Sequence, residues 1–574
     1  MRKQWLAILV ALVLLSGIPV MAQEAVVEGQ GTGMRGAIVV EMTFDGSRIA
    51  SMAVKEHQET YGIGYGLAET PIEVLPAEIV ESQSLAVDMV SGATITCASI
   101  IRAATEAIKA AGLDPADYEA TIPASAAADR TLEADVVVAG AGAAGLSAGI
   151  EALSNGASVI VLEKQGITGG ATARCGGKFL AAGTSWQQAQ GYEDDPELMF
   201  EYLKEVGGDK LDDDKVRDFC EHSVETLTWI EEMGVKMQDV EAIHSSLTPW
   251  RVHNVVGAGG MTDGHGGQFT VPLTQRFETL GGQIVYQATA DAIVTDESGK
   301  ACGLTALMAD GSRVTVKANA VILATGGYAQ NRALLDFPAV QGYHTSVPTG
   351  NVGDGLTMAE AVGASVYVPD YTQVVYVSFT CGVGINEEAG LIVNDQGVRC
   401  ANEYTYQYHV SDSVARTGSS AAYYIADAND PNPTVQYGMT LDSTPRADSV
   451  EALAESIGMQ PEALAATVAR YNELCEHGED KDFGKPTDKM IALAGPTFYA
   501  IKMSPCVTVT YGGLNINRDA QVLTDGGAPI DGLYAAGEVA FTGLFGTEYP
   551  CCGMAVGSAV YFGRVAGAQA ATAE

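Results

Sequence analysis

The chain has 574 residues, of which 47% are hydrophobic and 18% charged, so it is long and apolar enough to form several folded domains. Asp and Glu outnumber Lys and Arg by 71 to 32, which gives a formal net charge of −39 at pH 7. This balance excludes sequence-independent binding to nucleic acid or to anionic lipid, because both require a cationic surface. The cysteines form no CxxC pair, which excludes a zinc ribbon and a CxxCH haem attachment.

The first 22 residues have the pattern of a secretory signal peptide. Arg2 and Lys3 precede an apolar run over residues 5–15, and Val20 and Ala22 are small residues at the −3 and −1 positions before Gln23. The run is shorter than the roughly 20 residues of a bilayer-spanning helix, which favours a cleaved signal over a retained membrane anchor. We therefore expect an extracytosolic protein, at the cell surface or in the periplasm.

A small α+β domain is predicted over residues 30–112. Two strands, at residues 36–44 and 49–54, flank the hairpin signal Asp45-Gly46. A helical pattern over residues 98–111 follows the string from Asp88 to Thr96. Polar side chains at this point cap a helix, and the helix N-terminus also offers N–H groups to a phosphate. Spacing alone leaves both interpretations open.

The string from Asp88 to Thr96, Asp-x-x-Ser-Gly-Ala-Thr-x-Thr, resembles a flavin-attachment motif. Together with Glu59-Thr60 it is similar to the FMN-binding domain of sodium-pumping quinone reductases and of flavinylated extracytosolic reductases. The resemblance implies that Thr94 carries covalent FMN through a phosphodiester bond. It also implies that Asp88 belongs to the signal that a flavin transferase reads. After this domain, residues 113–134 are rich in alanine and proline and are expected to form a linker.

A dinucleotide-binding motif opens the remaining chain, residues 135–574. A buried apolar strand is predicted at residues 135–139, followed by Gly140-Ala-Gly142-Ala-Ala-Gly145 and a helix at residues 146–154. A second strand ends at Glu163, whose carboxylate is expected to bind a ribose hydroxyl. The glycines allow a tight turn, close approach of a pyrophosphate and close helix packing. The motif therefore predicts an α/β fold.

The motifs Gly169-Gly170-Ala171-Thr172, Ala324-Thr325-Gly326-Gly327 and Gly532-Leu533-Tyr534-Ala535-Ala536-Gly537-Glu538, within residues 133–570, resemble segments of the flavoprotein family of fumarate reductase and succinate dehydrogenase. The resemblance implies a Rossmann-like domain that binds FAD non-covalently, with an inserted α+β cap domain over the substrate. Further cofactor-binding residues expected on this basis are Ala171, Thr172, Gly176, Gly177, Asp354, Glu538, Ala555 and Val556.

The residues that hold a dicarboxylate in fumarate reductases are replaced in this chain. The arginine that donates the proton in that family aligns with Gln407, and its two histidines align with Val375 and Val509. Valines cannot compensate the loss of water around two carboxylates. A fumarate reductase is therefore excluded, and an apolar substrate is favoured.

A tyrosine motif stands where that family has its last arginine. Tyr549-Pro-x-x-Gly553 resembles the 3-ketosteroid dehydrogenases, in which the tyrosine hydroxyl and the glycine N–H bind a keto oxygen and a second tyrosine handles the proton. Tyr406 and Tyr408 are the candidates for this second role, and Tyr376 is a further one. A phenol with its ordinary pKa of about 10 carries its proton at neutral pH.

These resemblances imply a reductase of enones, with a 3-oxo-Δ4 or Δ1 steroid as the expected substrate. Electrons are expected to pass from a membrane-bound donor to FMN and then to FAD. One alternative is the reduction of an unsaturated acid, such as urocanate or cinnamate, with Arg251 or His253 holding a carboxylate. Another alternative is a flavin electron carrier without catalysis. No metal site is expected.

Overall fold

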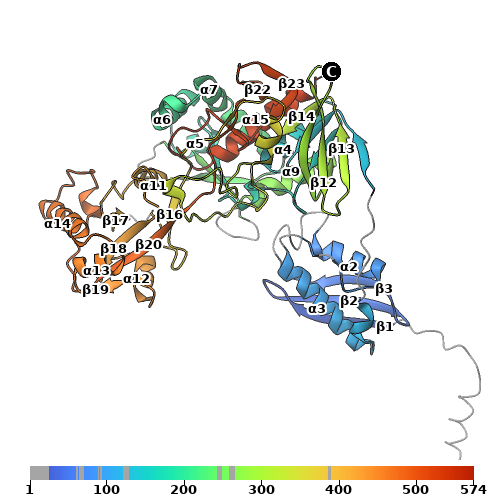
Figure 1. Ribbon diagram of the computed structural model, residues 1–574, viewed down its shortest axis with the longest axis horizontal. Helices are drawn as coiled ribbons and strands as arrows, with labels where there is room; N and C mark the ends of the chain where they lie inside the picture. Colours follow the sequence, from blue (N-terminus) through green and yellow to red (C-terminus); the bar gives the residue numbers. More distant parts are fainter. Residues whose placement is uncertain are drawn as a thin grey trace, which may run out of the picture. The chain divides into compact units, whose positions relative to one another are not determined.

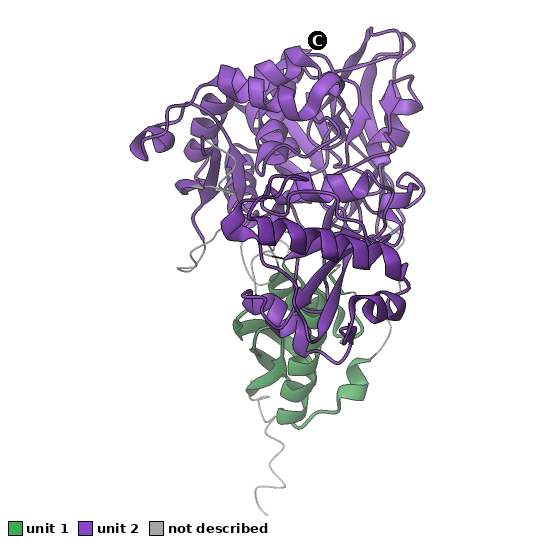
Figure 2. Ribbon diagram, turned by 90° about the vertical axis from the view of Figure 1, so that its left-hand side faces the viewer, with its two compact units in different colours: residues 1–126 green, residues 127–574 purple. Residues whose placement is uncertain are grey.

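The computed structural model describes residues 25–59, 63, 70–87, 89–90, 93–119, 128–241, 249–257, 265–385 and 390–573. The chain divides into two compact units, residues 1–126 and 127–574, which Figure 2 shows in green and purple. The expected signal peptide, residues 1–22, lies outside the described residues. Within those ranges, none of the helices has both the length and the apolar character needed to cross a bilayer.

Unit 1 is a three-stranded antiparallel sheet with two helices. The order of the strands is β1-β2-β3, and β2 sends alternate side chains into the core. The expected hairpin is confirmed, because β2 and β3 pair across a turn at Gly46, which has φ +63°. The elements are β1 (Ala25–Thr32), β2 (Ala37–Asp45), β3 (Arg48–Glu56), α2 (Pro71–Ser82) and α3 (Thr94–Ala110).

The helix after the flavin-attachment string differs from the prediction. It begins at Thr94 rather than at residue 98, and its N-cap is Ala93, which makes no side-chain capping bond. The serine and glycine of the possible cap, Ser91 and Gly92, lie outside the described residues. The helix starts earlier because Thr96 and Cys97 already belong to its buried face. Strand β1 and helix α2 were not anticipated, and α2 holds Pro76 within it.

Both ends of the expected linker, residues 113–134, are structured. Residues 115–118 form a short 3₁₀ turn whose Tyr118 is buried in unit 1 and donates its hydroxyl to the carbonyl of Ser47. Strand β4 (Arg130–Glu133) pairs in parallel with β13 (Arg313–Lys317) in unit 2. Residues 120–127 lie outside the described part of the chain.

Unit 2 is built around a six-stranded sheet with the order β10-β6-β5-β14-β23-β22 (Figure 1). Its pairs are parallel except for β22 with β23. Strands β5, β6 and β14 are wholly buried, as their continuous apolar runs predict. The strands are β5 (Val136–Ala139), β6 (Val159–Leu162), β10 (Gln283–Val285), β14 (Ala320–Leu323), β22 (Gln521–Leu523) and β23 (Pro529–Ala535).

Two helices pack closely on this sheet. Helix α4 (Ala143–Ser154) follows the glycine-rich turn, and α15 (Met554–Ala570) runs against it (Figure 1). A Cβ added at Gly563 would lie 2.5 Å from the carbonyl oxygen of Ala144. This distance is shorter than the contacts that real Cβ atoms make, so only glycine at residue 563 allows the two helices to approach this closely.

Smaller sheets and helices surround this core. The sheets have the strand orders β11-β12-β13-β4, β7-β9-β8 and β15-β21-β24. Their remaining strands are β7 (Lys178–Leu180), β8 (Met237–Glu241), β9 (Val252–Val255), β11 (Ala288–Thr295), β12 (Ala301–Met308), β15 (Val366–Tyr367), β21 (Gly512–Leu514) and β24 (Ala540–Phe541). The helices are α5 (Ser185–Ala189), α6 (Pro196–Gly207), α7 (Asp213–Glu221), α8 (Ser223–Glu232), α9 (Gly267–Thr279) and α10 (Asp354–Glu360).

The expected cap is a separate sheet and helix layer with its own hydrophobic cluster. Its strand order is β16-β20-β18-β17, with β19 paired to β20. The strands are β16 (Val375–Val377), β17 (Leu391–Asn394), β18 (Ala422–Asp427), β19 (Arg446–Ala447) and β20 (Phe498–Cys506). The helices are α11 (Gln407–Ala415), α12 (Pro433–Thr440), α13 (Val450–Ser456) and α14 (Pro461–His477).

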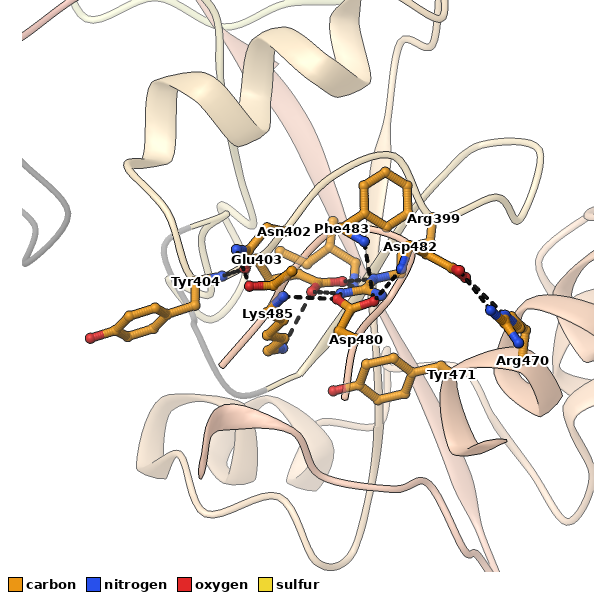
Figure 3. Close-up of polar contacts among 12 residues, drawn as sticks. Arg399, Asn402, Glu403, Tyr404, Arg470, Tyr471, Asp480, Asp482, Phe483 and Lys485 are labelled. Carbon is orange, nitrogen blue, oxygen red and sulfur yellow. Dashed lines mark hydrogen bonds and ion pairs between the residues drawn. The ribbon is translucent and has the colours of Figure 1, made fainter. Parts of the chain in front are cut away.

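A buried ion network fixes the segment of the cap that leads into α11 (Figure 3). Both oxygens of Glu403 accept hydrogen bonds from the Arg399 guanidinium, at 2.9 and 2.7 Å. Arg399 also donates to Asp480 at 2.8 Å, and the Lys485 ammonium lies 3.3 Å from Glu403. Two cations therefore balance two anions inside the cap, which is the condition under which buried charges are tolerated.

We expect Glu403→Gln to destabilise unit 2 by about 3–5 kcal/mol, because the variant leaves an uncompensated positive charge in the interior. Thermal or urea denaturation of the purified protein measures this loss. The control is Arg470→Gln, which removes the two ion pairs of exposed Arg470 with Asp482 and Glu473 and should leave the transition unchanged. Equal transitions for wild type and Glu403→Gln would contradict this account of the network.

Candidate active site

A cavity opens where the central parallel strands end. Its wall includes the turn after β5, Glu163 after β6 and residues 324–326 after β14. The carboxyl ends of parallel strands meet at one edge of a sheet, where nucleotide ligands bind in α/β proteins. The cavity therefore lies at the edge that the glycine motif predicts.

The three glycines of the motif have different local roles. Gly140 has φ +101°, and a Cβ there would lie 2.4 Å from the carbonyl oxygen of Ala324. Gly145 packs against Gly140, whose carbonyl oxygen would lie 2.0 Å from an added Cβ. At Gly142 a Cβ would meet only an oxygen at 3.9 Å, so this position leaves room beside the backbone for a bulky phosphate group.

Two carboxylates border the cavity, that of buried Glu163 and that of partly buried Glu538. Glu163 accepts the backbone N–H of Ala141 and of Gln165, each at 2.7 Å. Glu538 accepts the N–H and the hydroxyl of Thr510, also at 2.7 Å. Burial raises the pKa of both carboxyl groups. That Glu163 binds a ribose hydroxyl remains a prediction, since its bonds here fix the turn itself.

The donor and acceptor set of the wall fits a dinucleotide. The hydroxyl of Thr325 is buried in the wall and has no hydrogen-bond partner among the described residues. Asp354, at the start of α10, lies 2.7 Å from the ammonium of Lys164. A ligand with phosphates and hydroxyls would satisfy such groups, whereas a purely apolar ligand would not.

The structure brings most of the expected cofactor residues together. Those that line the cavity are Gly140, Gly142, Glu163, Ala171, Thr172, Asp354, Glu538, Ala555 and Val556. Gly145, Gly176 and Gly177 do not line it. Sequence reasoning missed Gln165, Asn351 and Thr508, which also line the wall, because no motif marks single residues in loops.

Three tyrosines meet beside the cavity, although they come from distant parts of the sequence. The ring of Tyr408 lies 5.1 Å from that of Tyr406 and 4.7 Å from that of Tyr549. Tyr406 and Tyr549 are buried and Tyr408 is partly buried, and loss of water around the hydroxyls raises the pKa of each well above its ordinary value. The cluster therefore consists of neutral phenols that retain their protons at neutral pH.

Tyr549 points into the protein and not into solvent. Its ring stacks on Phe545 with centroids 5.5 Å apart, and its hydroxyl accepts the backbone N–H of Ala555. Ala555 lines the cavity and belongs to the first turn of α15. The phenol therefore lies next to the cavity, at the positive end of a helix dipole.

Cys552 and Gly553, which follow Tyr549 in the chain, fix the position of the tyrosine cluster. The Tyr406 hydroxyl donates to the Cys552 thiol at 3.1 Å and accepts the Cys552 N–H at 2.9 Å. Gly553 has φ +86° and is the N-cap of α15. A Cβ at this position would lie 2.6 Å from the backbone of Phe179, so another residue would displace the strand beneath.

The residues that replace the dicarboxylate clamp are apolar or already bonded. Val509 lines the cavity, and Val375 is half-buried in β16. Gln407 is the first residue of α11. The Tyr376 hydroxyl donates to the carbonyl of Ser419 at 2.7 Å, which leaves this candidate without a free proton for the substrate.

The two basic residues proposed for a carboxylate are also engaged. Arg251 donates two hydrogen bonds of 2.8 Å to buried Asp194. His253 shares a 2.8 Å hydrogen bond with the Thr184 hydroxyl, and burial lowers its pKa to about 4. At neutral pH His253 is therefore uncharged, and the charge of Arg251 is balanced within the protein.

The expected flavin-attachment residue of unit 1 is accessible. Thr94 is exposed at the first position of α3, and Thr96, two residues on, donates its hydroxyl to buried Glu59 at 2.8 Å. This bond anchors the start of the helix while Thr94 faces solvent. Asp88, Ser91 and Gly92 lie outside the described residues.

The ten cysteines are free thiols. Among the residues that the structure describes, no group of three or more His, Cys, Asp or Glu side chains is arranged to hold a metal ion.

Comparison with known proteins matches two family models. The FAD binding domain covers residues 135–556, and the FMN-binding domain covers residues 33–109. The chain is 31% identical to a urocanate reductase of Eggerthella lenta, over 95% of this chain and 91% of that protein. It is 34% identical to a cytochrome-type fumarate reductase of Shewanella frigidimarina, over 76% of this chain and 77% of that protein.

A similar solved structure is that of a 3-ketosteroid-Δ4-(5α)-dehydrogenase from Rhodococcus jostii RHA1 in complex with 4-androstene-3,17-dione. It is 29% identical and has a TM-score of 0.66, over 77% of this chain and 97% of that chain. The expected fold is confirmed, as are the two flavin cofactors, FAD and FMN.

We expect Thr94→Val to abolish covalent flavin while unit 1 stays folded, because the variant removes only the hydroxyl that would bond to the phosphate. Mass spectrometry of protein co-expressed with a flavin transferase measures the attached FMN. Thr94→Ser retains a hydroxyl and serves as the control that should still be modified. Full FMN attachment to Thr94→Val would place the bond at another residue.

Proposed function

The chain belongs to the FAD binding domain family of flavin-dependent oxidoreductases that act on C=C bonds, and we propose that this member reduces enones. A 3-oxo-Δ4 or Δ1 steroid is the substrate type that the site favours. The observation that carries this proposal is the neutral, buried hydroxyl of Tyr549 beside the cavity. We further propose that residues 1–22 export the chain, and that a membrane-bound donor passes electrons to FMN and then to FAD.

The geometry suits a substrate with an uncharged carbonyl group. Reduced FAD, when bound, supplies a hydride to the β-carbon of the enone, and negative charge then develops on the carbonyl oxygen. The Tyr549 hydroxyl and the N–H of Gly553 are the proposed donors to that oxygen. Preorganised donors of this kind act strongly where water is excluded, and losing one typically costs about 2.7–4 kcal/mol in the transition state.

The α-carbon also needs a proton, and the cluster contains two further phenols. Tyr406 and Tyr408 lie on the cap side, in ring contact with each other and, through Tyr408, with Tyr549. We propose Tyr408 as the donor, because its ring contacts that of Tyr549 directly, whereas the Tyr406 hydroxyl is held by two hydrogen bonds to Cys552. A neutral phenol is a suitable general acid for carbon at neutral pH.

The walls favour an apolar substrate. Val509 and Phe541 line the cavity, whereas Arg251 is held by Asp194. A carboxylate placed here would have to displace that ion pair or remain uncompensated, and both are costly.

A second candidate is an unsaturated carboxylic acid. The similarity to the urocanate reductase extends over nearly the whole chain, and this similarity favours the acid more than the enone. Arg251 would then have to turn from Asp194 toward the substrate. The third candidate is a non-catalytic electron carrier. Only the loss of the residues that would bind a dicarboxylate supports it.

A panel of acceptors separates these functions. Holoenzyme reduced with dithionite under anaerobic conditions is mixed with 3-oxo-Δ4 and Δ1 steroids, urocanate, cinnamate and fumarate, and flavin absorbance is followed. We expect the steroids to reoxidise the flavin fastest. Faster reoxidation by an acid would establish the second candidate, and no reoxidation by any compound would favour the carrier.

The role of Tyr549 is tested on the best enone. We expect Tyr549→Phe to lower kcat/KM by about 100-fold or more, because one of two donors to the oxygen is lost. Tyr376→Phe removes a hydroxyl that bonds only within the cap and serves as the matched control. Unchanged turnover in Tyr549→Phe would remove the proposed carbonyl site.

A further inference from the structure

Helix α11 and the segment 548–553 meet through two pairs of neighbouring residues. Tyr408 and His409 are consecutive on α11, and Glu548 and Tyr549 are consecutive ahead of α15. The ring centroids of Tyr408 and Tyr549 lie 4.7 Å apart, and Nδ1 of His409 lies 2.6 Å from Oε2 of Glu548. A hydrogen-bonded carboxylate therefore stands directly beside the contact between the two phenols of the proposed mechanism.

Both oxygens of Glu548 are bonded to α11. Oε2 is bonded to His409, and Oε1 accepts a hydrogen bond from the guanidinium of Arg416, the C-cap of the helix. Burial opposes the charge of Glu548, but the bonds to His409 and Arg416 outweigh it and hold the pKa of its carboxyl group below the ordinary value. Charge-assisted bonds of this kind are short and directional, so they fix the position of what they join.

The segment that contains Tyr549 is also fixed from the core, without the cap. Tyr202 on α6 donates its hydroxyl to the carbonyl oxygen of Pro550. The ring of Tyr549 stacks on that of Phe545, with centroids 5.5 Å apart. Tyr202 and Phe545 both belong to the hydrophobic cluster of the FAD-binding core. The proposed site for the carbonyl oxygen therefore keeps its place even if the cap moves.

Helix α11 depends on contacts across this boundary. The two hydrogen bonds of Tyr406 with Cys552 hold only the residue that precedes the helix. The bonds to Glu548 hold the helix itself, near its start at His409 and at its end at Arg416. Two points along a helix fix its rotation as well as its distance from the core. The direction of the side chains between them is then fixed too.

We propose that Glu548 is a positioning residue for proton transfer, which holds the Tyr408 phenol in one place relative to the carbonyl-oxygen site at Tyr549. This inference rests on the proposed function. Reduction of an enone adds a hydride to the β-carbon from the core side and a proton to the α-carbon from the cap side. Since a displacement of about 1 Å can slow a step about 100-fold, a phenol that moves loses the α-carbon to protons from water.

The stereochemistry of protonation tests this role. Holoenzyme reduced with dithionite is mixed with the best enone in D₂O, and NMR of the rapidly quenched product locates the deuterium on the α-carbon. We expect one face to be labelled by the wild type. Glu548→Gln, which removes the charge but keeps the size, should place about a tenth or more of the label on the other face. Its first flavin reoxidation should stay within about twofold of the wild-type rate, because the core still holds Tyr549.

A second variant interrupts the same contact from the cap. His409→Phe keeps a ring against Tyr406, whose centroid lies 5.6 Å away, but it loses the Nδ1 atom that bonds Glu548. It should also label both faces. The double variant should label the second face no more than Glu548→Gln alone, since both changes act on one contact. His409→Phe tests the role even if Glu548→Gln fails to bind FAD.

Glu151→Gln is the matched control. Glu151 is also a partly buried carboxylate, 21% exposed against 18% for Glu548, and it lies 3.3 Å from the guanidinium of Arg564. This ion pair joins α4 to α15 and does not involve the cap. The variant should keep both the wild-type rate and a label on one face.

Two results on the product would overturn the proposal. A label confined to one face in both Glu548→Gln and His409→Phe would mean that the contact does not position the phenol. A slower first reoxidation with the label still on one face would mean a general structural role.

A measurement without substrate separates this inference from the proposed function. Hydrogen exchange of the backbone amides of residues 407–416 in oxidised holoenzyme should become about tenfold faster in Glu548→Gln, and it should not change in Glu151→Gln. Unchanged exchange in Glu548→Gln would overturn the inference. If the exchange becomes faster but the wild type reduces no acceptor, the proposed function fails, and Glu548 keeps only the role of joining α11 to the core.

Discussion

The hydrogen bonds between Tyr406 and Cys552 join the cap to the cofactor-binding core, and the site depends on this contact. Tyr406 precedes α11, and Cys552 precedes α15. The rings of Tyr406, Tyr408 and Tyr549 meet at this contact, and loss of water around their hydroxyls keeps these groups neutral. The uncharged chemistry of the site therefore follows from the packing of two segments that are about 150 residues apart in the chain.

In an enzyme that binds an acid, arginines hold the carboxylate of the substrate. In this molecule two arginines are paired with carboxylates of the protein instead. Arg251 is paired with Asp194, and Arg399 with Glu403 and Asp480. In both cases a guanidinium that could hold a substrate carboxylate instead stabilises the fold around the site. Glu403 illustrates the point, because its ion pairs fix the segment from which Tyr406 and Tyr408 project.

The sequence was most informative where a motif dictates backbone geometry. The turn from Gly140 to Gly145 and the carboxylate of Glu163 could be predicted, because their spacing reflects steric needs of the backbone. The choice between Tyr406 and Tyr408 could not be predicted, since it depends on how α11 meets residues 549–553.

The close packing of α4 against α15 has a mechanical consequence. Gly567 and Ala148 approach so closely that a methyl group would lie 2.1 Å from a carbonyl oxygen, so the two helices cannot slide independently. One helix starts at the pyrophosphate turn and the other at Gly553. The cofactor-binding turn and the proposed binding site for the carbonyl oxygen of the substrate therefore belong to one rigid frame. The alignment of the cofactor with the carbonyl oxygen is then set by this frame, whereas the proposed proton donor, Tyr408, comes from the cap.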